Sequence, residues 1–170
     1  MKNRPEKIML SGCLALSLVW SLQANAEELR IGFVSPITGI FAQIGKDMVD
    51  GFQLYLDEHG GKLGGADVKF IVEDSIGKPD AAVTKAKKLV LQDNVQMLVG
   101  GLLASTGYAL APVSTSEKVL YISSISAADD LTQRQLSNFP YFIRTGWSSS
   151  QPTHAIGKWA CEQDTRRWSR

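Results

Sequence analysis

The chain is poor in cysteine and histidine, with two of each among its 170 residues. Cys13 lies in an apolar segment near the N-terminus, so only Cys161 belongs to the body of the chain. A single cysteine there excludes an internal disulfide framework. His59 and His154 stand far apart, with no cysteine at metal-ligand spacing, so no metal site is predicted. The hydrophobic core must therefore hold the fold together.

A surplus of one charge sign is also missing. The first 26 residues carry three of the 18 basic and one of the 17 acidic residues, which leaves 15 basic and 16 acidic residues beyond them. Without a basic stripe, the chain has no footprint for nucleic acid. The glycine-rich run Gly60–Gly65 follows a predicted helix instead of preceding one, so it is not a phosphate loop and no nucleotide cofactor is predicted.

The N-terminal segment has the pattern of a secretory signal peptide. A basic start is followed by the apolar run Ile8–Leu22, too short for a membrane span, and by the small-x-small sequence Ala24-Asn25-Ala26. We expect cleavage after Ala26 and export to the periplasm, which leaves a length suited to one compact domain. Lipidation at Cys13 is less favoured because the cysteine precedes most of the apolar run.

Strand and helix patterns alternate along the rest of the chain. Short apolar runs predict strands at Leu29–Ser35, Asp67–Glu73, Val95–Val99, Val119–Ile122 and Tyr141–Arg144. Helical periodicity predicts helices at Gln43–Glu58, Asp80–Gln92, Tyr108–Ser116 and Gln151–Glu162. This alternation indicates an α/β fold with a doubly wound parallel sheet. We predict the strand order 2-1-3-4-5.

With this order, three loops converge where the strand order reverses, between strands one and three. They span residues 35–41, 100–107 and 123–129, and ligands of such sheets bind beyond the carboxyl ends of the strands. The second loop places Ser105 and Thr106 where a helix should begin. A helix start presents unpaired N–H groups and a positive dipole end, and either hydroxyl can cap it. We therefore predict a corner that holds a small anionic group such as a carboxylate.

An ordered series of motifs carries a family resemblance. The series includes Ile31–Gly39, Ala42–Gly45, Gly60-Gly61, Ser105-Thr106, Asp130-Leu131-Thr132, Phe142–Thr145 and Ser149-Ser150-Gln151. Across Leu29–Gln163 the chain resembles the periplasmic solute-binding proteins of the leucine/isoleucine/valine-binding type, which have the type 1 periplasmic binding fold. These proteins are the receptors of ABC importers.

The resemblance implies a binding protein and not an enzyme. Such proteins have two α/β lobes that close on a ligand and deliver it to an ABC permease in the inner membrane, without a cofactor. Residues 27–163 would then be the N-terminal lobe. The expected function is the substrate-binding component of an ABC importer for amino acids or related small carboxylates.

The resemblance also implies the site residues. It places Ser105, Thr106 and the loop of Ser126 and Ala127 on the ligand carboxylate, and Ile44 over the ligand. Binders of branched-chain amino acids often carry an aromatic residue at the place of Ile44 and a threonine near Ala127. Their absence favours an aromatic or short aliphatic acid. Each residue also has a structural alternative: a helix cap for Ser105, a turn for Ser126, and core packing for Ile44.

Neighbouring residues are interpreted as structural. Asp129 and Asp130 have the residue type of N-caps for a short helical turn. Arg144 is interpreted as a tie of the hinge, and Trp147 and Trp159 as packing residues. None of the five is expected to contact the ligand.

Two other functions share some of these features. An extracytoplasmic sensor domain of the same fold, which reports a ligand to a signalling partner, has every feature described above. An exported α/β enzyme needs a nucleophile–base–acid set, and neither histidine lies in a strand-end loop. The sensor is therefore the stronger alternative.

The family pattern stops at Asp164. Residues 164–170 are polar and basic, where the family has an apolar strand of the second lobe. Restoring one nucleotide before the Asp164 codon allows the reading Gly-Tyr-Lys-Thr-Val-Val, which is a turn and a buried strand. We therefore expect a frameshifted or truncated gene product without its second lobe. Ligand binding should then be weak or undetectable, because a clamp needs two lobes to exclude water.

Sequencing the locus across the Asp164 codon tests the frameshift. We expect a reading frame for a second lobe just downstream, in a different frame. A downstream sequence with no such reading frame contradicts the idea.

Overall fold

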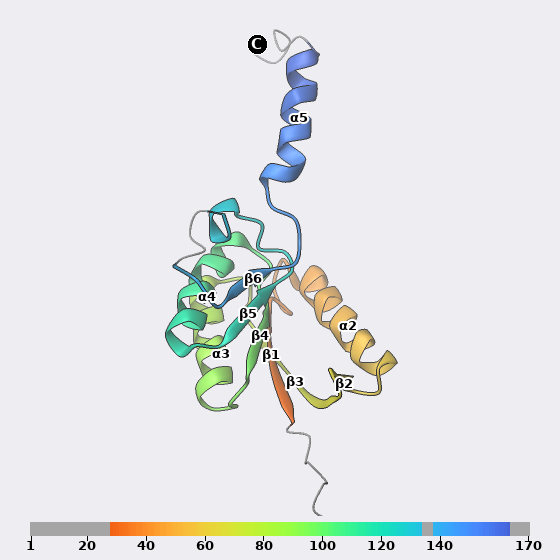
Figure 1. Cartoon of the computed structure of the whole chain (residues 1–170), viewed down its shortest axis with the longest axis vertical. Coiled ribbons are helices and arrows are strands. Elements are labelled where there is room, and N and C mark those ends of the chain that lie inside the picture. The colour runs from red at the N-terminus through yellow and green to blue at the C-terminus, as the bar shows by residue number, and fades with distance from the viewer. Residues whose placement is uncertain (1–27, 134–137, 164–170) are drawn as a thin grey trace, which may run out of the picture.

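The computed structural model describes residues 28–133 and 138–163 (Figure 1). The predicted signal peptide with its cleavage site and the predicted tail at 164–170 lie outside these residues. In chain order the elements are β1 (Leu29–Ser35), α2 (Ala42–Glu58), β2 (Lys62–Leu63), β3 (Ala66–Asp74), α3 (Pro79–Leu91), β4 (Met97–Gly100), α4 (Ala104–Glu117), β5 (Leu120–Ser123), the 3-10 turn η2 (Asp129–Leu131), β6 (Phe142–Arg144) and α5 (Ser150–Glu162). Every predicted strand and helix is present, with shifts at the ends.

The sheet has the order β2-β3-β1-β4-β5-β6. All neighbouring strands pair in parallel except β2 and β3. The predicted order 2-1-3-4-5 is confirmed, because the predicted strands correspond to β3, β1, β4, β5 and β6. β2 was not predicted; its two residues pair antiparallel with the start of β3. The sheet is therefore mixed at one edge.

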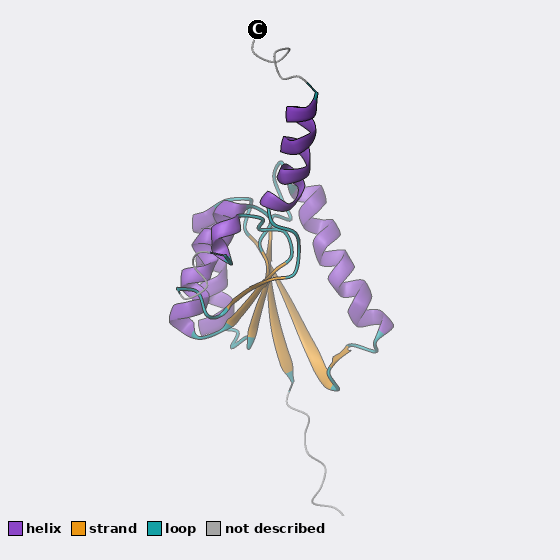
Figure 2. Cartoon of the chain, turned by 45° about the horizontal axis from the view of Figure 1, so that its top comes forward, coloured by secondary structure: helices purple, strands orange, loops and turns teal. Residues whose placement is uncertain are grey.

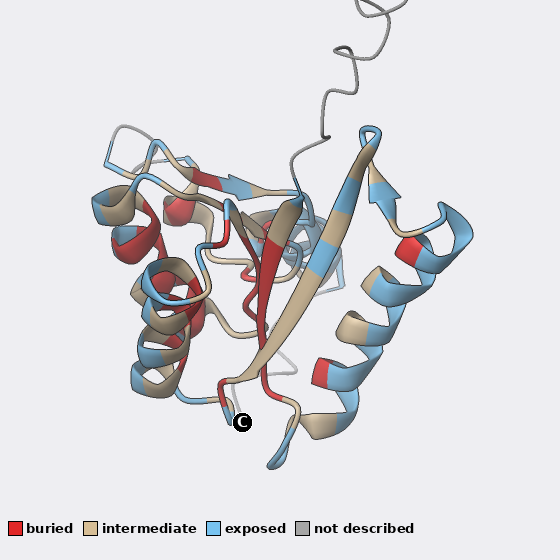
Figure 3. Ribbon diagram, turned by 90° about the horizontal axis from the view of Figure 1, so that it is seen from below, coloured by how far each residue is buried: buried red, intermediate tan, exposed pale blue. Residues whose placement is uncertain are grey.

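Helices cover both faces of the sheet (Figure 2). α3 and α4 pack together on one face, and α2 lies against the other (Figure 1). The core under α3 and α4 is the larger one, and each of its members Leu89, Leu98, Leu110, Tyr121 and Phe142 is at most 2% exposed. Buried residues accordingly gather on the central strand and on the sheet-facing sides of α3 and α4 (Figure 3).

The core under α2 is built on three aromatic rings. Phe52 of α2 stacks on Phe70 of β3 with ring centroids 4.8 Å apart, and Phe33 of β1 meets Phe70 edge-on at 5.6 Å. Met48 and Phe52, four residues apart on α2, both pack in this cluster. Ile44 is 48% exposed, so core packing does not explain it.

α5 extends away from the body of the lobe (Figure 1), and none of its residues is buried. Trp159 is 55% exposed and Trp147, which precedes the helix, is 54% exposed. The interpretation of both tryptophans as packing residues is therefore wrong for the described part of the chain, because α5 does not lie against the sheet. Among residues 28–133 and 138–163, no helix has the length and apolar character needed to cross a membrane.

Two lysines of α3 contact a carboxylate of β3. Lys85 Nζ lies 2.7 Å from Glu73 Oε2 and Lys88 Nζ lies 2.6 Å from Glu73 Oε1. Hydrogen bonds from Lys85 and Lys88 hold the pKa of Glu73 below its ordinary value, against the opposite effect of burial. The charged form of Glu73 therefore ties α3 to the sheet.

The variant Glu73→Gln should unfold at a lower urea concentration than the parent at about pH 7. Because the pKa of Glu73 is lowered in the folded state, its stabilising effect is present above the unfolded-state pKa. The effect is lost as the pH falls through the folded-state pKa. Urea titrations at about pH 7 and about pH 3 should therefore show the difference between variant and parent shrinking on acidification.

Glu58→Gln is the matched control, because Glu58 is exposed and has no salt bridge among the described residues. It should leave the urea midpoint unchanged. A difference between Glu73→Gln and the parent that stays constant with pH contradicts the assignment.

Candidate functional site

The carboxyl ends of β1, β4 and β5 lie at the same edge of the sheet. β1 sits between β3 and β4, so the chain leaves β1 toward α2 on one face and leaves β4 toward α4 on the other. This is the point where the strand order reverses, and it is where such sheets bind ligands. The loops after β4 and β5 touch through Ser126, whose Oγ lies 3.1 Å from the carbonyl oxygen of Gly101.

The predicted caps of α4 are wrong. The N-cap is Leu103, in extended conformation and without a side-chain cap, and the helix begins at Ala104. Ser105 and Thr106 are thus the second and third helical residues. Ser105 is exposed, whereas Thr106 is 2% exposed. Only the Ser105 hydroxyl is therefore open to solvent.

The first turn of α4 has free hydrogen-bond donors. The first bond back into the helix start runs from Gly107 N–H to the Leu103 carbonyl, at 3.1 Å. The N–H groups of Ala104, Ser105 and Thr106 donate to no acceptor within the described residues. Three N–H groups at the positive end of a helix dipole, beside an exposed hydroxyl, form a site that favours an anion without any cationic side chain.

Ser126 is buried and shapes the corner from below. Its hydroxyl lies 3.1 Å from the carbonyl oxygens of both Gly101 and Leu103, and its N–H donates to Ser123 Oγ at 3.1 Å. The Ser126 side chain is 0% exposed. The hydrogen bonds of Ser126 are therefore those expected of a hydroxyl that holds a turn, which was the structural alternative to ligand binding. A role of Ser126 in contacting a ligand stays a prediction.

Tyr121 completes the buried polar layer under the corner. Its hydroxyl donates to the Gly100 carbonyl at 3.2 Å, and burial raises the pKa of Tyr121 to about 12. Gly101 has a φ of +78°, and a Cβ there would lie 2.1 Å from the Tyr121 hydroxyl oxygen. Only glycine fits this turn, for both its conformation and its space.

Asp74, at the end of β3, anchors the loop after β1. Its Oδ1 accepts the N–H groups of Ile37 at 3.1 Å and Ile76 at 2.8 Å, and its Oδ2 accepts the Thr38 hydroxyl. Burial raises its pKa, but these hydrogen bonds outweigh burial and lower it overall. The anchored loop leads into α2, so Ile44 stands half-exposed on the first turn of that helix.

The loop at Ala127 is held from two sides. The Arg144 guanidinium donates to the Ala128 carbonyl at 2.6 Å and to the Thr132 hydroxyl at 2.7 Å. The Ala127 carbonyl accepts the N–H and the hydroxyl of Ser149, at 2.8 Å and 3.0 Å. Arg144 therefore ties this loop to the end of β6, and its interpretation as a tie of the hinge stays a prediction. Ala127 offers a ligand only its backbone N–H and methyl group.

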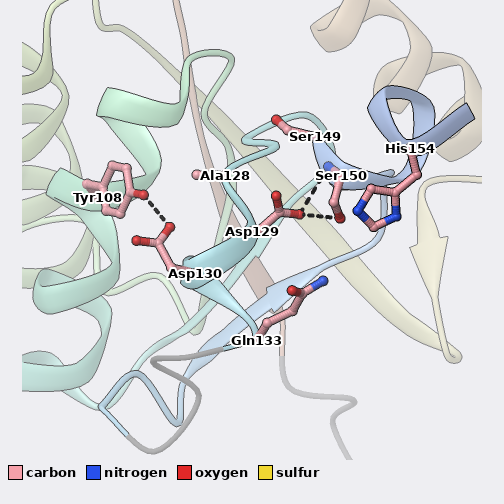
Figure 4. A pocket seen from close by; sticks show the side chains of 8 residues that line it. All are labelled: Tyr108, Ala128, Asp129, Asp130, Gln133, Ser149, Ser150 and His154. Atoms are coloured by element: carbon pink, nitrogen blue, oxygen red, sulfur yellow. Dashed lines mark hydrogen bonds between the residues drawn. The ribbon is translucent and has the colours of Figure 1, made fainter. Parts of the chain in front are cut away.

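A pocket of about 580 Å³ lies beside this loop (Figure 4). Its polar lining includes Asp129, Asp130, Tyr108 and His154, and Asp130 accepts the hydroxyl of Tyr108. The neighbouring Asp130 raises the pKa of Tyr108. Two carboxylates repel an anionic ligand, so this pocket is not the predicted carboxylate site. Ser105, one of the predicted residues, does not line it.

The N-cap role predicted for Asp129 and Asp130 is wrong. The N-cap of η2 is Ala128, and both aspartates lie inside the turn. Asp129 instead accepts hydrogen bonds from Ser150 at the start of α5, 21 residues later in the chain. A side chain that caps a distant helix has no local sequence signal. Among the described residues, no three histidine, cysteine or acidic side chains gather as a metal site.

A doubly wound lobe with free helix N–H groups at its switch point belongs to the class of small-molecule binding lobes. A family comparison specifies the class further. The chain belongs to the periplasmic binding protein family, whose model matches residues 28–169. The matched range includes residues of the predicted tail, whose boundary stays a prediction.

Individual relatives agree with this assignment. The Leu/Ile/Val-binding protein homolog 6 of Brucella abortus is 27% identical over 164 residues, which are 95% of this chain and 40% of that protein. A solute-binding protein of an ABC transporter from Rhodopseudomonas palustris, in complex with 3,4-dihydroxybenzoic acid, has a TM-score of 0.74 at 28% identity, covering 81% of this chain and 37% of that one.

A third relative binds an amino acid. The branched-chain amino acid transporter substrate-binding protein of Streptococcus pneumoniae, in complex with isoleucine, has a TM-score of 0.66 at 25% identity over 73% of this chain and 35% of that one. The chain thus spans about 40% of the length of the curated relatives that it matches. These relatives are binding proteins, which supports the expectation of a non-enzymatic role.

Gly101→Ala should lower the free energy of unfolding by about 2 kcal/mol, because alanine is strained at this φ and meets Tyr121. Tyr121→Phe removes the hydroxyl that the new methyl group would contact. Thermal or urea unfolding of both single variants and the double variant should show that the double variant loses less stability than the two single losses added together.

Gly51→Ala is the control, since a Cβ at this exposed position of α2 meets nothing within 4 Å. It should stabilise the chain by up to about 1 kcal/mol, the helix preference of alanine over glycine. Additive losses in the Gly101 and Tyr121 double variant contradict the close contact.

Proposed function

We propose that the chain belongs to the substrate-binding component of an ABC importer, works in the periplasm and delivers its ligand to an inner-membrane permease. The observation that carries this proposal is the start of α4, where the N–H groups of Ala104 to Thr106 are free beside the exposed Ser105 hydroxyl. The likeness of the chain to a solute-binding protein of an ABC transporter and to the substrate-binding protein of an amino acid transporter supports it.

The proposed ligand is a small carboxylate, such as an amino acid or an aromatic acid. The two ligands of the solved relatives, 3,4-dihydroxybenzoic acid and isoleucine, differ in their bodies and share a carboxylate. A helix N-terminus recognises that shared group, because three oriented N–H donors and the dipole favour negative charge. The N–H of Ala127, which also has no acceptor among the described residues, is a further donor.

The body of the ligand is proposed to lie toward α2. Ile44 stands half-exposed on the first turn of α2, where it offers an aliphatic surface and no polar group. An aliphatic side chain at that place packs against an aromatic ring or a short alkyl chain and gives an α-amino group nothing to bind. We therefore favour an aromatic or short aliphatic acid over a branched-chain amino acid.

We further propose that residues 27–170 alone bind this ligand weakly. Ser105 is exposed and Ile44 is 48% exposed, so a ligand resting on them keeps one side in water. Hydrogen bonds that remain in contact with water contribute little, because they only replace bonds to the solvent. A dissociation constant of about 1 mM or higher is expected.

Titration of the ¹⁵N-labelled chain tests the site directly. Adding 3,4-dihydroxybenzoate or benzoate should shift the amide signals of Ala104, Ser105, Thr106 and Ala127, while benzamide, which has the same ring without the charge, should leave them unchanged. Equal shifts with benzamide, or shifts confined to other parts of the chain, contradict the carboxylate site. A micromolar constant contradicts only the weak binding.

Ala104→Pro should weaken benzoate binding by about threefold, because it removes one donor to a charged acceptor at a site that stays partly in contact with water. Proline suits this first helical position, and Leu103 before it is already extended at φ −87° and ψ 150°. Ser105→Ala, which removes a hydroxyl and keeps every N–H, should weaken binding less. Binding is measured by the same amide titration, and an effect of Ser105→Ala larger than that of Ala104→Pro contradicts recognition by the helix start.

A further inference from the structure

The connection between β6 and α5 is a short linker over residues 145–149. Thr145, Gly146 and Trp147 are exposed, and α5 itself buries none of its residues. Side-chain packing within the described part of the chain therefore does not set the direction of α5. What sets it must lie at the N-terminal end of the helix, the part nearest the lobe (Figure 1).

The segment 126–129 contacts the chain on both sides of this linker. Before the linker, Arg144 donates to the Ala128 carbonyl at 2.6 Å. After the linker, the N–H and the hydroxyl of Ser149 both donate to the Ala127 carbonyl, at 2.8 Å and 3.0 Å. The linker is thus bridged at both ends by one short segment of the lobe.

Asp129 adds the contact that reaches the helix itself. Its Oδ1 accepts the Ser150 N–H at 3.2 Å and the Ser150 hydroxyl at 2.8 Å (Figure 4). The carboxylate therefore caps the first turn of α5, although it belongs to another segment of the chain. The positive end of the helix dipole also stabilises a negative charge there. The hydrogen bonds from Ser150 lower the pKa of Asp129, so the group is charged at neutral pH.

The middle of the linker also passes close to the lobe. A Cβ on Gly146 would lie 1.8 Å from the carbonyl oxygen of Ser124, in the loop after β5. Any side chain at this position would push the linker away from that loop. Because Gly146 has no side chain, the linker can pass close to the loop after β5. Arg144 and Ser149 hold its two ends.

We propose that Asp129 is a positioning residue that sets the direction of α5 relative to the lobe, which makes the linker a joint with one preferred angle. The N–H and hydroxyl groups of Ser149 and Ser150, four donors in all, bond a segment that Arg144 holds in place. Asp129 is the charged member of this set and the one that contacts α5. Without it, the hydrogen bonds of Ser149 to the Ala127 carbonyl are left to hold the start of α5, so the helix can take a wider range of directions, because α5 buries none of its residues.

A distance measurement between α5 and the body tests the joint. Spin labels are placed on Cys161, in the last part of α5, and on Gln53→Cys, exposed on α2, in the full chain carrying Cys13→Ser. Pulsed electron spin resonance then reports the distribution of distances without any ligand. We expect a single narrow distribution for the parent, and for Asp129→Ala a distribution about twice as wide.

Three variants make the test specific. Asp129→Asn keeps an oxygen acceptor for Ser150 and should give an intermediate width. Ser150→Ala, which removes only a hydroxyl of α5, should broaden the distribution as well. Asp130→Ala is the matched control: the neighbouring carboxylate bonds Tyr108 and not α5, so the parent width should remain.

Urea unfolding separates the joint from global stability. Because α5 buries nothing, Asp129→Ala should keep the urea midpoint of the parent while its distance distribution broadens. A parent width in Asp129→Ala, equal broadening in Asp130→Ala, or a parent distribution that is already broad would each overturn the proposal. Since no ligand is present, failure of the carboxylate site leaves this measurement unaffected.

Discussion

The candidate site depends on buried hydrogen bonds to the turn between β4 and α4. Tyr121 donates to the Gly100 carbonyl, and the Ser126 hydroxyl lies 3.1 Å from the carbonyl of Gly101. These bonds satisfy carbonyl groups that no strand partner reaches, and they hold a turn that glycine alone can adopt. This turn sets the position and direction of the start of α4. The hydroxyls of Tyr121 and Ser126 bond carbonyl groups of the turn. The N–H groups at the start of α4 and the hydroxyl of Ser105 have no such partner and stay available to a ligand.

Carboxylates near this edge of the sheet serve structure more than recognition. Asp74 binds the N–H groups of the loop after β1, and Asp129 binds the first turn of α5. In both places a charged acceptor satisfies hydroxyl and backbone donors outside its own element, and these hydrogen bonds lower the pKa of each group against the opposite effect of burial. The first turn of α4 itself holds no acidic residue.

The fold was largely predictable from the sequence, and the site only in part. Apolar runs and helical periodicity are local signals, so the α/β alternation and the strand order were correct, while the two residues of β2 carry no such pattern. The prediction placed the corner at the correct helix start, but it named Ser105 or Thr106 as the cap, whereas the N-cap is Leu103. Where α4 begins depends on the path of the chain through Gly101 and Leu103, and a serine or threonine nearby does not decide it.

By itself the sequence determined the class of fold, the edge of the sheet proposed to bind a ligand, and the family. These follow from periodicity and from an ordered series of short motifs, both of which can be read along the chain. Only the tertiary structure decided that Ser126 supports the corner from below, that Ile44 is half-exposed, and that Asp129 caps α5. Hydrogen bonds between residues more than twenty positions apart depend on how the chain returns on itself, and local patterns carry no record of that path.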